Sequence, residues 1–157
     1  MLDVKMQLSL AISLAAQGHM EQMDKGGKPY ILHPIKVMHY LKTDDMELMA
    51  IGVMHDLVED TDMTCEKLAE LGFSKRVVKA VDLLSKKEGQ SDEEYIQGII
   101  GNYDAICVKL CDLRHNSDVR RLKGLTDKDL LRMRKYHSMY KLLEAAKKNY
   151  ELIKVKM

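Results

Sequence analysis

Four residues in three short phrases carry side chains that together suit a metal ion. His33 stands in Tyr-Ile-Leu-His-Pro, and the adjacent His55 and Asp56 open His-Asp-Leu-Val-Glu-Asp-Thr. Asp112 stands in Lys-Leu-Cys-Asp-Leu-Arg-His-Asn. Two imidazoles and two carboxylates are a ligand set for manganese, iron or zinc, and such a metal lowers the pKa of a bound water while it holds a phosphate group. The pattern therefore predicts a metal-dependent phosphohydrolase.

Each of these residues also has an explanation that needs no metal. A His-Asp pair is common and fits a solvated, acidic helix end. Asp112 follows apolar residues of an expected helix, where a lone carboxylate should have a partner, and Lys109 and Arg114 are nearby candidates. His33 could be a core histidine or a capping group at a helix start. Four such residues in three recognisable phrases nevertheless favour the metal site.

Two further carboxylates follow the His-Asp pair at the spacing of a helical turn. Glu59 lies one turn after His55 and Asp60 one turn after Asp56, so a helix would place all of them on one polar face. These acidic groups repel one another unless a cation is bound. A carboxylate one turn from the ligands is also within reach of a water held by the metal. We therefore expect Glu59 and Asp60 to be the catalytic proton-transfer residues.

The rest of the sequence indicates a single all-α domain, a compact helical bundle. Its 157 residues suffice for one core, and with no Trp and one Phe that core must rely on Leu and on 12 Met, which is typical of helical packing. Pro34 suits the first turn of a helix, and Thr64 and Ser74 are expected N-caps. The expected helices cover residues 2–16, a segment that begins near His33, 45–58, 64–71, a segment after Ser74, 92–100, 103–122 and 127–149.

Composition argues against several classes of function. The formal net charge is +1, so the chain has no strong field toward nucleic acid or a membrane. Three cysteines without a Cys-x-x-Cys spacing argue against a disulfide framework and for a reducing compartment. There is neither a signal-peptide pattern nor an apolar run of about 18 residues. We therefore expect a soluble, cytoplasmic protein, whose oligomeric state the sequence does not indicate.

The three phrases belong to a longer ordered set that resembles the HD-superfamily hydrolases of the RelA/SpoT type, the small alarmone hydrolases and metazoan SpoT homologues. The resemblance covers nearly the whole chain. Its members are Ala15-Ala16, His19, Gln22, Lys25-x-Gly27-x-Pro29-Tyr30-x-x-His33-Pro34, His55-Asp56, Glu59-Asp60-Thr61, Leu84-Ser85-Lys86, Lys109-Leu110-Cys111-Asp112, His115-Asn116 and Arg134-Lys135-Tyr136.

The resemblance implies one HD domain over residues 1–157 that uses Mn²⁺ to remove pyrophosphate from the 3′ position of guanosine tetra- or pentaphosphate. It implies that His33, His55, Asp56 and Asp112 bind the manganese, although another divalent metal is possible. It also implies that Glu59 and Asp60 handle the attacking water and the leaving group. Further residues match positions near the nucleotide, although surface or packing roles also fit them: Lys25 and Lys86 near the phosphates, Asn116 near the ribose and phosphate region, and Tyr136 in the pocket lining.

Three departures from the family pattern lie on the nucleotide side of the expected site. Asp24 stands where the family usually has an Arg that resembles a stacking platform for guanine, and a carboxylate cannot fill that role. Glu21 stands where Gly is usual. The run Ser117-Asp118-Val119 replaces a Met-Arg-Thr-like run and so removes a cation. The metal centre is intact, while the edge that recognises the base is altered.

These departures leave alternatives to the alarmone hydrolase. One is an HD phosphohydrolase that acts on another phosphorylated nucleotide. The other is a non-catalytic nucleotide-binding or antitoxin-like regulator, against which the complete Glu59-Asp60 pair argues, because a pure binder needs no proton transfer. In each case the expected partner is a small-molecule nucleotide. The chain ends about where such a hydrolase domain ends, so we expect no synthetase domain.

Overall fold

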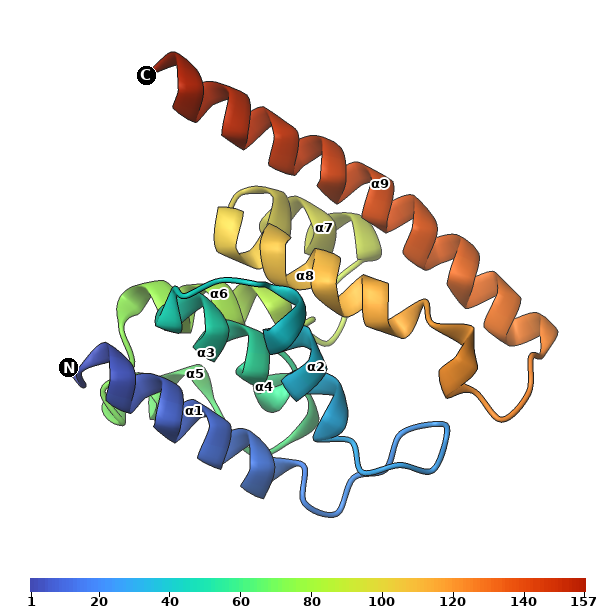
Figure 1. Cartoon of the computed structure of the whole chain (residues 1–157), viewed down its shortest axis with the longest axis horizontal. Helices are drawn as coiled ribbons and strands as arrows, with labels where there is room; N and C mark the ends of the chain where they lie inside the picture. Colours follow the sequence, from blue (N-terminus) through green and yellow to red (C-terminus); the bar gives the residue numbers. More distant parts are fainter.

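The protein folds into helices packed around one core, as the sequence predicts. A computed structural model describes all residues, 1–157 (Figure 1). There is no β-strand, and Met23 and Pro29 form an isolated antiparallel bridge in the loop between the first two helices. The elements are α1 (Val4–Gly18), α2 (Leu32–Tyr40), α3 (Met46–Met54), α4 (Leu57–Asp60), α5 (Cys65–Glu70), α6 (Lys75–Leu84), α7 (Asp92–Ile100), α8 (Tyr103–Asn116), the 3₁₀ helix η1 (Val119–Arg121) and α9 (Asp127–Lys156).

Helix α3 is the centre of the core. It packs against α1, α2, α6 and α8, and all residues from Ala50 to Met54 are buried, so it has no solvent-facing side along that stretch. Gly52 lets α2 approach closely, because a Cβ atom there would lie 2.9 Å from Leu41 Cδ1 and 3.3 Å from Met38 Cα. This close approach of α2 and α3 brings His33, near the start of α2, beside the end of α3.

The predicted helix starts are confirmed where a short polar side chain can cap them. Thr64 accepts a hydrogen bond from the Lys67 backbone N–H, and Ser74 accepts one from the Val77 N–H. The helix predicted over 92–100 is confirmed as α7. Pro34 lies in the first turn of α2, where its missing N–H costs nothing.

Two predicted helices are interrupted in the structure. The helix predicted over 45–58 stops at Met54, and His55 and Asp56 separate α3 from the short α4. The helix predicted over 103–122 ends at Asn116, because Asp118 accepts a hydrogen bond from the Arg120 N–H and starts η1 instead. Both interruptions lie within or beside expected site residues, where local side-chain hydrogen bonds replace the regular helix ladder.

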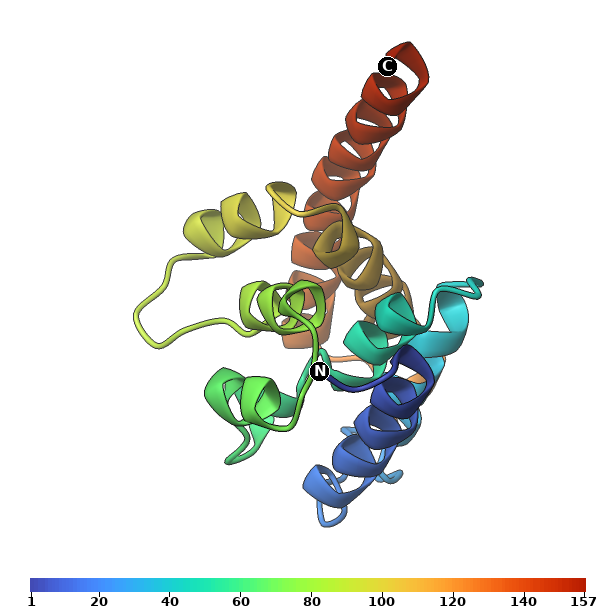
Figure 2. The same ribbon diagram turned by 90° about the vertical axis from the view of Figure 1, so that its left-hand side faces the viewer.

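Helix α9 continues to Lys156, beyond the predicted end at residue 149. Its middle part packs on α8 through buried Met139 and Leu143, and its C-terminal turns extend past the rest of the molecule (Figures 1 and 2). No helix has the length and apolar character needed to cross a membrane. All three cysteines are free, as expected.

Candidate metal centre

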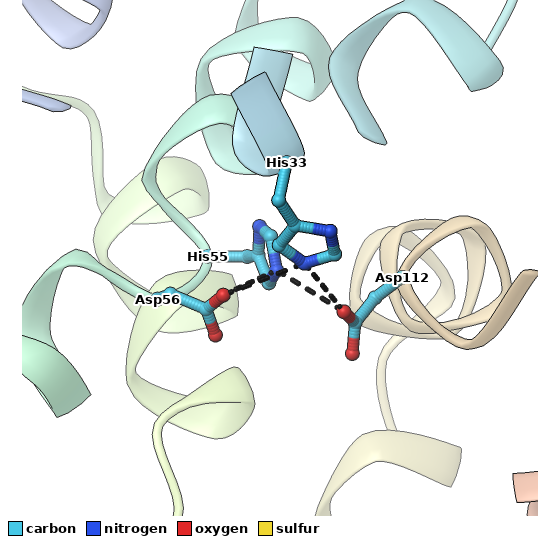
Figure 3. Close-up of side chains that lie close together, drawn as sticks. All are labelled: His33, His55, Asp56 and Asp112. Carbon is cyan, nitrogen blue, oxygen red and sulfur yellow. Dashed lines mark hydrogen bonds and ion pairs between the residues drawn. The ribbon is translucent and has the colours of Figure 1, made fainter. Parts of the chain in front are cut away.

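The four predicted ligands meet at one point from three different elements. His33 comes from the first turn of α2, His55 and Asp56 from the junction of α3 and α4, and Asp112 from α8 (Figure 3). One ligand atom from each residue can be chosen so that all lie within 4.8 Å of one another. The side chains of His33, His55 and Asp112 are almost fully buried. The sequence prediction that these residues form one cluster is thus confirmed.

The break after Met54 explains how two adjacent residues can face the same point. On a continuous helix His55 and Asp56 would project about 100° apart. Asp56 instead adopts φ −103° and ψ −3°, and it ends the regular part of α3. Its Oδ2 then lies 2.9 Å from His55 Nε2 and 3.6 Å from His33 Nε2.

His55 is oriented as a metal ligand. Its Nδ1 donates to the Gly52 carbonyl over 2.8 Å, so in the neutral ring Nε2 carries the lone pair. Nε2 is buried and makes no hydrogen bond, although Asp56 Oδ2 and Asp112 Oδ1 lie only 2.9 Å and 3.4 Å away. Burial lowers the pKa of His55, but the two carboxylates outweigh burial and raise it well above its ordinary value. The two carboxylate oxygens thus favour a positive charge at Nε2, which is a proton when no metal is bound, and a divalent metal in its place fits this donor set.

His33 is oriented by a residue to which the sequence assigned no role. Its Nδ1 lies 2.7 Å from Nδ1 of His115, whose ring stacks on it, while its Nε2 lies 2.9 Å from Asp112 Oδ1. Burial and the nearby charges of Arg121 and His33 lower the pKa of His115 to about 4. A neutral His115 can accept the His33 Nδ1 proton, and this leaves His33 Nε2 free to bind the metal.

Asp112 faces the cluster, and it also forms an ion pair with Lys109, the partner that would account for its burial without a metal. Its Oδ2 accepts a hydrogen bond from Lys109 Nζ over 2.8 Å, and its Oδ1 accepts one from Asn116 over 2.8 Å. Burial raises the pKa of Asp112, but Lys109 and the two histidines outweigh burial and hold it well below its usual range. Arg114, the other candidate partner, lies over the ring of Tyr40 instead, 4.0 Å from its centre.

Asp56 has a partner that sequence reasoning missed. The Tyr30 hydroxyl donates to Asp56 Oδ2 over 2.5 Å. Burial raises the pKa of Asp56, yet His55 outweighs burial and lowers it to about 2. Burial and the Asp56 charge raise the pKa of Tyr30, so this tyrosine stays protonated and remains a donor. Tyr30 appeared only as part of the family phrase, and nothing in the sequence pattern pairs it with Asp56.

Glu59 and Asp60 lie on α4, and each is held by a polar partner. Glu59 Oε1 accepts the Lys86 backbone N–H over 2.7 Å, and Asp60 Oδ2 accepts Gln22 Nε2 over 3.1 Å. Gln22 is held in turn by His19 Nδ1, 2.8 Å from its Oε1. Partial burial, reinforced by the Asp56 charge, raises the pKa of both carboxyl groups. A carboxyl group with a raised pKa is better matched to proton transfer near neutral pH.

A cavity of about 340 Å³ is lined by three of the four predicted substrate residues, Lys25, Asn116 and Tyr136, but not by Glu59 or Asp60. Tyr30, Gln22 and Asn116 line it as well, and they hydrogen bond to Asp56, Asp60 and Asp112 respectively. The cavity is therefore coupled to the metal cluster through direct contacts.

Lys86, the fourth predicted substrate residue, does not line this cavity. Its backbone N–H reaches Glu59, while its ammonium group lies 2.5 Å from Asp92. Of the acidic departures from the family pattern, Asp24 and Asp118 lie in the cavity wall and Glu21 does not.

No family model matches the chain, whereas individual relatives do. It is 32% identical over 124 residues to the bifunctional (p)ppGpp synthase/hydrolase SpoT of Escherichia coli K12, a match covering 70% of this chain and 17% of that protein. It is 33% identical over 128 residues to a probable guanosine-3′,5′-bis(diphosphate) 3′-pyrophosphohydrolase of Synechocystis, covering 74% of this chain and 17% of the relative. The chain thus spans less than a fifth of the length of these relatives.

A solved structure shares the fold. It is described as a metazoan ortholog of SpoT that hydrolyzes ppGpp and plays a role in starvation responses. The two superpose with a TM-score of 0.74 at 22% sequence identity, over 91% of this chain and 92% of the other. The similarity in sequence to the SpoT-type proteins and the shared fold confirm the resemblance of this domain to the RelA/SpoT-type hydrolase domains.

Proposed function

We propose that this protein is a Mn²⁺-dependent hydrolase that removes pyrophosphate from the 3′ position of guanosine tetra- or pentaphosphate, with all 157 residues forming one HD domain. The observation that carries the proposal is the buried His33, His55, Asp56 and Asp112 cluster, with a nucleotide-sized cavity beside it. The activities printed for the SpoT-type relatives support the choice of substrate.

Two imidazole nitrogens and two carboxylate oxygens would hold the metal. Nitrogen and oxygen donors without thiolate suit manganese, although other divalent metals accept the same set. When bound, the metal polarises the phosphoryl group and lowers the pKa of a water. Hydrogen bonds with His115, Gly52 and Tyr30 fix the side chains of His33, His55 and Asp56 respectively, so the cluster needs little rearrangement to bind an ion.

Glu59 and Asp60 would carry the protons. One takes a proton from the attacking water, and the other supplies one to the leaving ribose oxygen. Their raised pKa values favour exchange of protons, and the contacts with the Lys86 N–H and with Gln22 fix their positions. We propose that Lys25, Asn116 and Tyr136 hold the nucleotide in the cavity. Lys86 acts chiefly through its backbone on Glu59, since Asp92 already neutralises its side chain.

The test is release of pyrophosphate from guanosine tetraphosphate by Mn²⁺-loaded protein, with nucleotide products separated by chromatography. We expect release that a chelator and Glu59→Gln both abolish. Glu70→Gln is the matched control, because Glu70 is an exposed helical residue with no hydrogen bond or ion pair. Turnover by Glu59→Gln at the wild-type rate would remove the assigned role of Glu59.

A second measurement separates a failed site from a wrong substrate. Asp112→Ala should lose metal retention and turnover together, measured as Mn²⁺ content after gel filtration and as rate. If metal-loaded wild-type protein releases nothing from guanosine tetraphosphate, the proposed substrate is wrong. Release of phosphate from another nucleotide would then identify the alternative hydrolase, and tight nucleotide binding without turnover would identify a regulator.

A further inference from the structure

The cavity beside the metal cluster has an arginine in its wall, Arg121, to which the sequence assigned no role. Arg121, at the end of η1, lines the cavity together with Asp24, Lys25 and Gly26 of the loop that precedes α2. That loop packs tightly on η1, because a Cβ atom at Gly26 would lie 2.3 Å from the Arg121 carbonyl oxygen. The two segments therefore form one rigid corner of the cavity.

The N–H edges of the Arg121 guanidinium are directed at protein acceptors. Its Nη1 donates to the His115 carbonyl over 3.1 Å and to Asn116 Oδ1 over 3.2 Å. Its Nη2 faces Asp24 Oδ2 at 3.6 Å. Asn116 is itself fixed, since its amide nitrogen donates to Asp112. A guanidinium whose edges are engaged in this way presents its flat face to a ligand, and flat guanidinium faces stack on planar rings.

The chemistry of the surrounding wall favours an uncharged, planar group over a phosphate. Met23, Leu122, Met133 and Tyr136 supply an apolar lining, while the cations Lys25 and Arg132 also line the cavity. The carboxylates Asp24 and Asp118 are each paired with an arginine, Arg121 for Asp24 and Arg120 for Asp118, so they add little net charge beside Arg121. Phosphates belong nearer the metal and Lys25, so the base is the part of a nucleotide that suits this corner.

We propose that Arg121 is the platform on which the nucleobase of the substrate stacks, and that Asp24 positions its guanidinium. This inference rests on the proposed function, because it takes a nucleotide as the substrate. It also gives Asp24 a role: the carboxylate does not contact the base but holds the group that does. Asp24 further fixes the loop, since its Oδ1 accepts the Lys28 backbone N–H over 2.9 Å.

The experiment measures ligand affinity by calorimetry on Mn²⁺-loaded Glu59→Gln protein, in which the nucleotide stays intact. Arg121→Lys keeps the positive charge and removes the plane, whereas Arg121→Gln removes the charge and shortens the group. We expect both variants to bind guanosine tetraphosphate about tenfold more weakly or worse, the size of one lost stacking contact. Affinity for inorganic pyrophosphate, which has no base, should change less than about twofold, a difference too small to count as a lost contact.

Three comparisons make the result specific. Arg134→Gln, an exposed α9 residue with no ion pair and no place in the cavity wall, should bind both ligands normally. Asp24→Asn should weaken guanosine tetraphosphate binding less than the Arg121 variants, without affecting pyrophosphate. Mn²⁺ content should be unchanged in every variant, since the ligands are untouched.

The stacking role is overturned if Arg121→Lys retains normal affinity, because charge alone would then suffice. It is also overturned if pyrophosphate binding weakens as much as nucleotide binding. Arg121 would then bind phosphate directly, or support the metal cluster through its contact with Asn116. Turnover by the wild-type protein tests the proposed function separately. Wild-type protein that binds the nucleotide without hydrolysing it would refute the hydrolase while leaving the stacking test intact, and a complete lack of nucleotide binding would refute both.

Discussion

Replacing His115 with leucine should weaken Mn²⁺ binding, although His115 is not one of the four ligands. Leucine preserves much of the side-chain volume but cannot accept the proton on His33 Nδ1, which lies 2.7 Å from His115 Nδ1. His33 is almost fully buried, so its Nδ1–H would lose its partner with little access to water. The imidazole would then rotate or switch tautomer, and Nε2 would no longer be held toward the metal.

The size of the effect can be worked out in two ways. An unsatisfied buried donor costs about 1–3 kcal/mol. Loss of a group that orients a metal ligand weakens metal affinity by about 10- to 100-fold, which corresponds to about 1.4–2.7 kcal/mol. The two ranges overlap. We therefore expect chelator-stripped His115→Leu to bind Mn²⁺ about 10- to 100-fold more weakly than the wild type in a calorimetric titration.

Two further variants decide whether the lost hydrogen bond is the cause. His115→Gln offers an amide oxygen as an acceptor, so it should recover part of the affinity. His137→Leu is the matched control, because His137 is exposed on α9 and has no contact with the cluster. Unchanged affinity in His115→Leu would refute the reasoning. Equal losses in the leucine and glutamine variants would attribute the effect to packing of the stacked rings instead.

Three other perturbations have outcomes that follow from the contacts. Arg76→Gln should lower the free energy of unfolding at pH 7 by no more than about 1 kcal/mol, because the ion pairs of Arg76 with Asp45 and Asp104 are partly exposed. Burial raises the pKa of Asp45, but Arg76 and backbone donors lower it overall. The stabilisation by the ion pair is therefore complete above the unfolded-state pKa of about 4 and is lost as the pH falls through the lower folded-state pKa. Urea unfolding at pH 7 and pH 3 should show that the difference in unfolding free energy between wild type and variant shrinks at the lower pH. Gly52→Ala should destabilise by about 1–3 kcal/mol through its contact with α2, and a wild-type melting temperature would contradict the close approach. Metal-free Glu59→Gln should melt at the wild-type temperature or up to about 4 °C higher at pH 7, because the neutral amide takes away a partly buried negative charge that lies near Asp56 and Asp60. A clearly lower melting temperature in differential scanning calorimetry would count against this.

The candidate ligands could be recognised in the sequence because each lies in a phrase with its own local signal. Thr64 and Ser74 were predictable as caps for the same reason, since capping depends on residues within one turn. Lys109, one turn from Asp112, was recognised as a possible partner and does form the ion pair. The caps and the pair Lys109–Asp112 join residues that are close in sequence, so helical periodicity relates them directly. The three phrases of the metal cluster are far apart in sequence, and their resemblance to those of the family is what related them.

The supporting contacts could not be found in this way because they join distant parts of the chain. The hydrogen bond from Tyr30 to Asp56 spans 26 residues, that from Gln22 to Asp60 spans 38, and the contact of His33 with His115 spans 82. No periodicity connects such positions before the helices have packed. The break after Met54 was missed for a related reason, since the apolar pattern of α3 and α4 reads as one continuous helix.

The acidic residues at the base-recognition edge have a different meaning in the structure from the one that the sequence indicates. In the sequence, Asp24 and Asp118 replace cations of the family pattern with carboxylates and leave the identity of the substrate open. In the structure the carboxylates face Arg121 and Arg120, so each is paired with a cation of η1. Asn116 contacts both Arg121 and the metal ligand Asp112. Asn116 therefore links this wall of the cavity to the metal cluster, and a substitution at Arg121 can reach the cluster only by displacing Asn116 or His115.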